Sequence, residues 1–140
     1  MIDLPDVNLW LALTSDSHAH HARALAWFDA VPARNSAFCR VTQHSLLRLL
    51  TNPKVMGADV LDNKQAWSIY DTTCSDERVL FLTEPSDVDV VWRRLTSVSE
   101  PRTLQWTDAY LAAFALTTGL RVVTFDRGFR EYPDVNVLLL

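Results

Sequence analysis

The hydrophobic and polar positions of the chain fall into blocks of two alternating kinds. Segments with apolar residues at helical spacing cover 9–13, 18–30, 41–50, 62–74, 86–98 and 107–118. Short apolar runs without strict polar alternation, typical of parallel strands buried on both faces, cover 1–4, 36–39, 79–82, 121–125 and 135–139. This alternation predicts an α/β fold with a mostly parallel sheet of four or five strands between helices.

Prolines, glycines and capping residues predict where these elements end. Pro5 cannot donate to a sheet ladder, so we expect the first strand to stop there. Pro53 ends the helix before it, and the segment 54–61 is expected to be a loop. Ser86 with Asp89 is close to a capping box, which predicts a helix start at Ser86. Gly119 is expected just past the end of the Ala-rich helix 107–118.

Length and composition indicate a single domain, residues 1–140, with an ordinary globular core. Hydrophobic residues make up 49% and charged residues 21% of the chain. We see no apolar run of membrane-spanning length and no secretory signal pattern, and the two cysteines form no metal-type pair. These features predict a cytoplasmic protein with reduced thiols. The net charge of −4 disfavours a surface built mainly for nucleic acid, but leaves room for a basic rim around an acidic site.

Three carboxylates occupy matching topological positions. Asp6 and Asp126 each follow a predicted strand, and Asp108 lies at the start of the helix that leads into the strand 121–125. In open α/β sheets, ligands bind beyond the carboxyl ends of the strands. Each aspartate taken alone is explained as a helix cap or turn residue. Their shared position favours a common site.

Clustered carboxylates repel one another, and a divalent cation removes that penalty. Mg²⁺ and Mn²⁺ prefer oxygen ligands, and such an ion can activate water and steady a leaving oxygen. The residues therefore indicate metal-assisted phosphoester chemistry. His18, His20 and His21 offer another possible metal site, against the simpler interpretation of a solvated helix start with one imidazole packed inward.

Four sequence blocks, in this order and spacing, resemble the PIN-domain ribonucleases, in particular the VapC-type toxins of bacterial toxin–antitoxin pairs. The resemblance spans nearly the whole chain. The blocks are Asp6-Val7-Asn8; Val41-Thr42-Gln43 with Leu47-Arg48 and Thr51-Asn52-Pro53; Thr107-Asp108-Ala109 with Leu111-Ala112-Ala113 and Ala115; and Thr124-Phe125-Asp126-Arg127-Gly128-Phe129.

The resemblance implies a PIN-like three-layer α/β/α sandwich that cleaves RNA with Mg²⁺, or Mn²⁺ as a substitute. It implies Asp6, Asp108 and Asp126 as catalytic metal ligands, and Asn8, Gln43 and Thr124 as site-lining residues. It also implies an RNA substrate, a small VapB-like antitoxin that silences the enzyme, and a homodimer. The family usually carries a Glu on the helix after the second strand. The position we align with it holds Gln43, which brings an amide oxygen but no charge.

Arginines around these positions are candidates for holding RNA phosphates. Arg127, beside Asp126, and Arg48 are the best placed, and solvated surface arginines are the alternative. Two rival functions remain. A phosphatase-like domain would carry a second acid where Asn8 stands, and a receiver-like domain would carry a Lys beyond Lys64. A catalytically weakened PIN-like module, which binds RNA or a partner without cleavage, is the second rival.

Overall fold

A computed structural model describes residues 1–103 and 105–140, whose strands form one five-stranded sheet. The strand order is β3-β2-β1-β4-β5, and each neighbouring pair is parallel. The strands are β1 (Asp3–Pro5), β2 (Ser36–Phe38), β3 (Val79–Phe81), β4 (Arg121–Thr124) and β5 (Asn136–Leu139). The predicted α/β class is confirmed, with five strands and a wholly parallel sheet.

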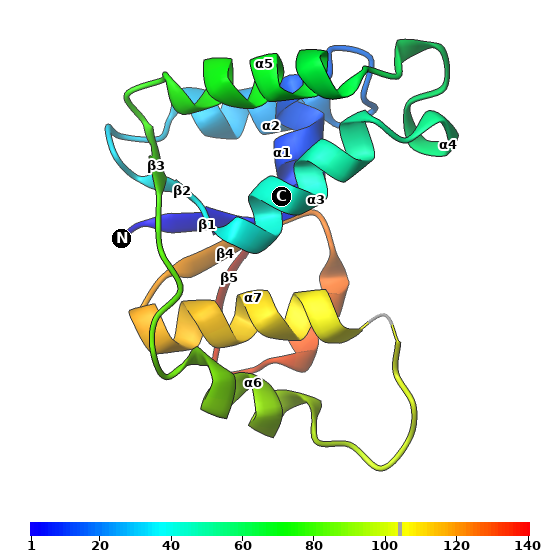
Figure 1. The fold of residues 1–140 in the computed structure, drawn as a ribbon. Helices are drawn as coiled ribbons and strands as arrows, with labels where there is room; N and C mark the ends of the chain where they lie inside the picture. The colour runs from blue at the N-terminus through cyan, green and yellow to red at the C-terminus, as the bar shows by residue number, and fades with distance from the viewer. Residues whose placement is uncertain (104) are drawn as a thin grey trace.

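Helices cover both faces of this sheet, which gives three layers (Figure 1). On one face lie α1 (Val7–Thr14), α2 (His21–Asp29), α3 (Arg40–Leu50) and α5 (Asn63–Cys74). On the other lie α6 (Val88–Thr96) and α7 (Gln105–Thr118). No helix of the described residues is long and apolar enough to cross a bilayer.

The two faces are packed by different residue types. On the α1 side, Trp10 and Phe38 stack with ring centroids 3.9 Å apart, and both are fully buried. On the α7 side, every residue from Ala109 to Ala115 is buried, since four alanines let this helix approach the sheet and α6 closely. Gly119 follows with φ of +71°, as expected for the residue that ends such a helix.

The strand order places a topological switch point between β1 and β4. From β1 the chain runs outward through β2 to β3, then crosses back to β4 on the other side of β1 and continues to β5. Asp3, Leu4 and Pro5 pair in register with residues 121–123 of β4. The bidentate pair from Arg121 to Asp3, at 2.8 and 3.0 Å, reinforces this pairing. The two carboxyl ends that flank the switch point are followed by Asp6 and Asp126.

Several predicted boundaries are wrong, for local reasons. The segment 54–61 is not a simple loop but holds α4 (Pro53–Met56) and the 3₁₀ turn η1 (Gly57–Asp59). The Asn52 side chain accepts from the Lys54 N–H at 2.9 Å, so the proline that closes α3 also begins the next helix. The first strand does stop at Pro5, which is the last residue of β1, but it begins at Asp3 rather than Met1.

Three helix starts also differ from the prediction. α2 begins at His21 rather than near His18. α6 begins at Val88, and Asp89 forms an i,i+4 ion pair with Arg93 at 2.6 Å instead of a capping box. α7 begins at Gln105, so Asp108 lies within its first turn rather than at its cap.

Candidate active site

Asp6 is held at the carboxyl end of β1 by the neighbouring strand. Its backbone N–H donates to the Val123 carbonyl at 2.9 Å, which continues the β1–β4 ladder by one residue. Its carboxylate accepts from the Val7 N–H at 2.6 Å and from the Thr124 hydroxyl at 3.0 Å. The side chain is therefore fixed while only 3% of the residue is exposed.

Thr124 links Asp6 to Asp126. The Thr124 side chain is fully buried, and its Oγ1 both donates to Asp6 and accepts from the Asp126 N–H at 2.9 Å. Asp126 in turn accepts from the Gly128 N–H at 2.8 Å and begins the 3₁₀ turn η2 (Arg127–Glu131). This Asp6–Thr124–Asp126 link ties together the two strand ends at the switch point. Thr124, predicted to line the site, lies between the Asp6 carboxylate and the Asp126 backbone N–H.

Asp108 approaches the link from the other layer of the molecule. In Figure 1, the first turn of α7 and the orange segment after β4 lie at the same end of the sheet. Burial raises the pKa of Asp108 to about 6, and the charges of Asp6, Asp126 and Glu131 act in the same direction. The three predicted carboxylates therefore lie within electrostatic reach of one another. Burial also raises the pKa of Asp6, with Asp126 adding to it, against the hydrogen bonds from Thr124 and Val7.

A groove of 270 Å³ runs between Asp6, Asp108 and one face of α3; we call it the α3 groove. Asn8 lines it beside Asp6, as predicted, and is exposed. Arg48 also lines it with an exposed side chain, so a predicted phosphate-binding residue reaches the same space as two of the carboxylates. Further lining residues are Ser45, Leu49, Asn52 and Thr107.

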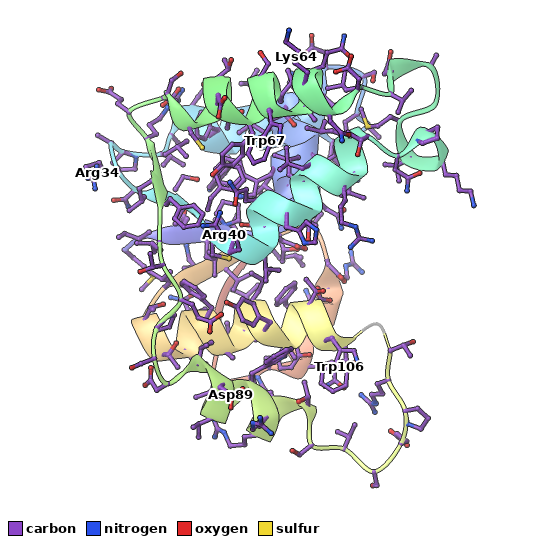
Figure 2. The ribbon with its side chains drawn as sticks, in the orientation of Figure 1. Arg34, Arg40, Lys64, Trp67, Asp89 and Trp106 are labelled. Carbon is purple, nitrogen blue, oxygen red and sulfur yellow. The ribbon has the colours of Figure 1, made fainter. Side chains whose placement is uncertain are left out.

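The expectation that Gln43 lines the site is not met. Gln43 is 8% exposed, its amide oxygen accepts from Arg40, and it is not among the residues that line the α3 groove. Helix geometry explains this, because residues two positions apart point to nearly opposite sides of a helix. Ser45, two residues further on, lines the groove instead. Figure 2 labels Arg40, at the start of α3.

Sequence reasoning missed Ser45, although it lies one turn before the predicted Arg48 on the same helix, and Asn52, which follows the end of α3. It also missed a second hollow, of 430 Å³, on the other side of Asp108; we call it the Tyr132 hollow. Its lining residues are Pro101, Arg102, Thr103, Gln105, Asp108, Gly128, Glu131 and Tyr132.

The predicted Arg127 is exposed at the start of η2, directly after Asp126.

The donor set suits a hard divalent cation, because Asp6, Asp108 and Asp126 present carboxylate oxygens from three different elements. Within residues 1–103 and 105–140, however, no three His, Cys, Asp or Glu side chains form a ready metal-binding group. The histidines near α2 are used in packing. The rings of His20 and Phe125 stack with their centroids 4.7 Å apart, and His21 Nδ1 lies 2.8 Å from the Ala12 carbonyl oxygen.

Comparison with known proteins identifies the family of this chain. The model of the PIN domain matches residues 4–135. The chain therefore belongs to the PIN-domain family, in its VapC branch. It is 43% identical over 142 residues to ribonuclease VapC41 of Mycobacterium tuberculosis, covering 98% of this chain and 97% of that protein. Ribonuclease VapC38 of the same organism is 35% identical, covering 98% of this chain and 96% of that protein.

Solved structures share the architecture at lower identity. VapBC2 from Rickettsia felis, solved bound to a DNA fragment from its promoter, matches with a TM-score of 0.69 at 13% identity, over 100% of this chain and 99% of the other. VapC20 of Mycobacterium tuberculosis, described as a toxin that cleaves the sarcin–ricin loop, also has a TM-score of 0.69, at 18% identity, over 91% and 92%. These likenesses establish the fold.

Proposed function

We propose that this chain is a metal-dependent endoribonuclease and the toxin of a toxin–antitoxin pair. Residues 1–140 act as one PIN-like domain in the cytoplasm, and RNA phosphodiester bonds are hydrolysed at Asp6, Asp108 and Asp126. The observation that carries the proposal is the Asp6–Thr124–Asp126 link at the switch point, with Asp108 within electrostatic reach. Membership of a family whose curated relatives are named ribonucleases supports the reaction type.

The three carboxylates would hold Mg²⁺, or Mn²⁺ in its place. Such an ion would supply a polarised water and would neutralise charge on the phosphate oxygens. The protein fixes the geometry, because Thr124 holds the Asp6 carboxylate and the Asp126 backbone in one arrangement. Asn8 offers an exposed amide beside Asp6, and Arg48 and Arg127 bind phosphates of the RNA strand. In the reaction, water adds to phosphorus and the bond to the leaving oxygen breaks.

The partners are an RNA, a small VapB-like antitoxin and a second copy of the chain. Support for the antitoxin comes from the solved relatives, several of which are VapBC pairs, from Rickettsia felis, Haemophilus influenzae and Salmonella typhimurium. The homodimer is an expectation from the family resemblance. Light scattering on the purified chain, alone and with its antitoxin, measures both assemblies.

Cleavage assays on purified aspartate variants test the enzymatic proposal. Asp6→Asn, Asp108→Asn and Asp126→Asn are each expected to lower RNA cleavage by about 10³-fold, because each removes a metal-binding charge. Asp71→Asn, an exposed aspartate on α5, is the matched control and should cleave like wild type. Each protein is assayed with Mg²⁺, with Mn²⁺ and with EDTA, alongside a thermal melt. An active, metal-independent Asp108→Asn protein contradicts the assignment.

One observation favours the second candidate, a weakened RNA- or partner-binding module. The α3 residues that line the groove, Ser45, Arg48 and Leu49, bring no carboxylate. If wild-type protein binds RNA in the presence of Mn²⁺ and leaves it intact, whereas Ser45→Glu cleaves it, the chain is such a module.

A further inference from the structure

The α3 groove and the Tyr132 hollow meet at one residue. Asp108 lines both, with Arg48 and Asn8 on one side of it and Arg102 and Tyr132 on the other. The Tyr132 hollow also reaches a second carboxylate, since Gly128 lines it and donates its N–H to Asp126. A ligand held at the carboxylates therefore has space on two sides, not one.

The Tyr132 hollow has the size and the chemical groups for one nucleotide. Its 430 Å³ lies within the range of sites that hold small organic ligands. Gln105 contributes a side-chain amide, which also donates to the Leu95 carbonyl at 3.2 Å, and Tyr132, only 7% exposed, contributes a small apolar part of the lining. A largely apolar lining with a few polar groups is typical of sites that hold an organic ring such as an unpaired base. Arg102 contributes a guanidinium, which matches the geometry of a phosphate.

The Arg102 guanidinium can exchange its carboxylate partners for a phosphate. Its guanidinium lies 2.8 Å from a Glu100 oxygen and 3.8 Å from a Glu131 oxygen, and 45% of its side chain is exposed. Ion pairs this exposed contribute little to stability. Glu100, through the shorter contact, and Glu131 hold Arg102 beside the hollow, and a phosphate can replace either carboxylate at small cost.

We propose that the Tyr132 hollow is the binding site for the nucleotide next to the scissile phosphate of a single-stranded RNA, with Arg102 contacting the flanking phosphate on that side. The inference rests on the proposed function. Asp108 is the shared wall, so a strand that presents an internal phosphodiester to the carboxylates extends into both hollows. A strand end would fill only one. The other side of the strand then lies in the α3 groove, against Arg48 and Asn52.

The test uses a short single-stranded RNA that wild-type protein cleaves once, and versions of it with one flanking phosphate replaced by a neutral methylphosphonate. Arg102→Gln should raise KM about tenfold with little change in kcat, because the contact lies beside the reacting atoms. Arg94→Gln, an exposed arginine on α6 that lines neither hollow, is the control and should match wild type.

The neutral-phosphate RNAs give the decisive comparison. Neutralising the phosphate on one side of the cleavage point should raise the KM of wild type about tenfold. It should leave the KM of Arg102→Gln unchanged, since that variant has already lost the contact. Neutralising the phosphate on the other side should instead remove the effect of Arg48→Gln. The inference is overturned if the KM of Arg102→Gln equals that of Arg94→Gln, or if Arg102→Gln raises KM by the same factor on every RNA.

Binding by fluorescence anisotropy, in the presence of Ca²⁺, separates this inference from the proposed function. A protein that binds short single-stranded RNAs with the Arg102-dependent pattern, yet cleaves none of them in Mg²⁺ or Mn²⁺, would keep the inference and refute the nuclease. A protein that cleaves RNA without that pattern would do the reverse.

Discussion

The strand half and the helix half of this site are built in different ways. At the strand ends, Asp6, Thr124 and Asp126 are joined by hydrogen bonds of 2.9 to 3.0 Å, and the connecting hydroxyl is fully buried. On the helices, Asp108 influences the other carboxylates through space, and Ser45 and Arg48 face a groove. The sheet therefore fixes the positions of two charges, whereas the helices bring in groups whose effect is mainly electrostatic.

This difference has a consequence for mutations. Substitutions in the strand half should cost both stability and activity, because buried hydrogen bonds are broken. Substitutions in the helix half should change metal affinity and pH dependence while the fold tolerates them, or gains from them.

The largest effect is expected at Thr124. Thr124→Val keeps the shape and removes the hydroxyl, which leaves the buried Asp6 carboxylate without one donor and the Asp126 N–H without its acceptor. We expect a loss of about 2 kcal/mol in the free energy of unfolding and a large drop in cleavage. Urea unfolding and the RNA assay measure the two. Thr124→Ser, which restores the hydroxyl, should recover most of the activity; an unaffected valine variant would show that the link does not position the site.

In metal-free protein, removing the charge of Asp108 should raise the free energy of unfolding, whereas Thr124→Val should lower it. Its pKa is raised to about 6, against about 4 in an unfolded chain, so the folded state binds the proton more tightly. Its charge therefore destabilises the fold above pH 6, and this penalty is relieved as the pH falls from about 6 to 4. Discounted for solvent screening, the effect is about 1 kcal/mol.

Urea unfolding in EDTA at pH 5 and pH 7.5 measures this penalty. Asp108→Asn should be more stable than wild type at pH 7.5, and the advantage should shrink at pH 5. A variant less stable than wild type at both values would mean that the charge of Asp108 is favourably paired in the fold.

A smaller effect is expected from adding a carboxylate to α3. Ser45→Glu places a fourth acid in the groove and should tighten Mn²⁺ binding about fivefold. Gln43→Glu lies on the other side of the helix and should leave the affinity unchanged, although the sequence alone suggested the reverse. Calorimetric titration with Mn²⁺ compares the two variants. Tighter binding by the Gln43 variant would restore Gln43 to the site.

The smallest effect is expected at Gly128. A Cβ atom there would lie 3.1 Å from Asp126 Oδ1, so Gly128→Ala must shift that carboxylate by a few tenths of an ångström. We expect a loss of cleavage of only a few-fold, about 0.5 to 1 kcal/mol in transition-state stabilisation, with an unchanged melting temperature. A loss as large as that of Asp126→Asn would mean that the carboxylate has no freedom to adjust.

The sheet, and the positions of Asp6 and Asp126 directly after strand ends, could be predicted from the sequence, because both follow from chain topology. An apolar run followed by Asp is visible in the sequence, and parallel strands bring their carboxyl ends to one edge whatever their order. The helix half was harder. Which side of α3 faces the carboxylates depends on how the helix is rotated against α1 and the sheet, and this choice exchanged Gln43 for Ser45.

Local chemistry explains the remaining misses. Pro53 was expected only to end a helix, yet with Asn52 as a cap it begins another. The Tyr132 hollow was not predicted, because it joins η2 to residues 101–103 and 105, which lie outside the sequence blocks that resemble the family. Metal binding by the carboxylates stays a prediction.

The β1–β4 pairing also bears on when activity can arise. Asp6 and Thr124, which share a hydrogen bond, are 118 residues apart, and β1 makes its other pairing with β2. A ribosome must therefore complete nearly the whole chain before the first carboxylate can meet its partner. Closing so long a loop is slow, so the strand pairing that creates the site is a late event in folding. We therefore expect a toxin with this proposed site to be inert while it is being made, and prematurely terminated chains that lack β4 to carry no complete site.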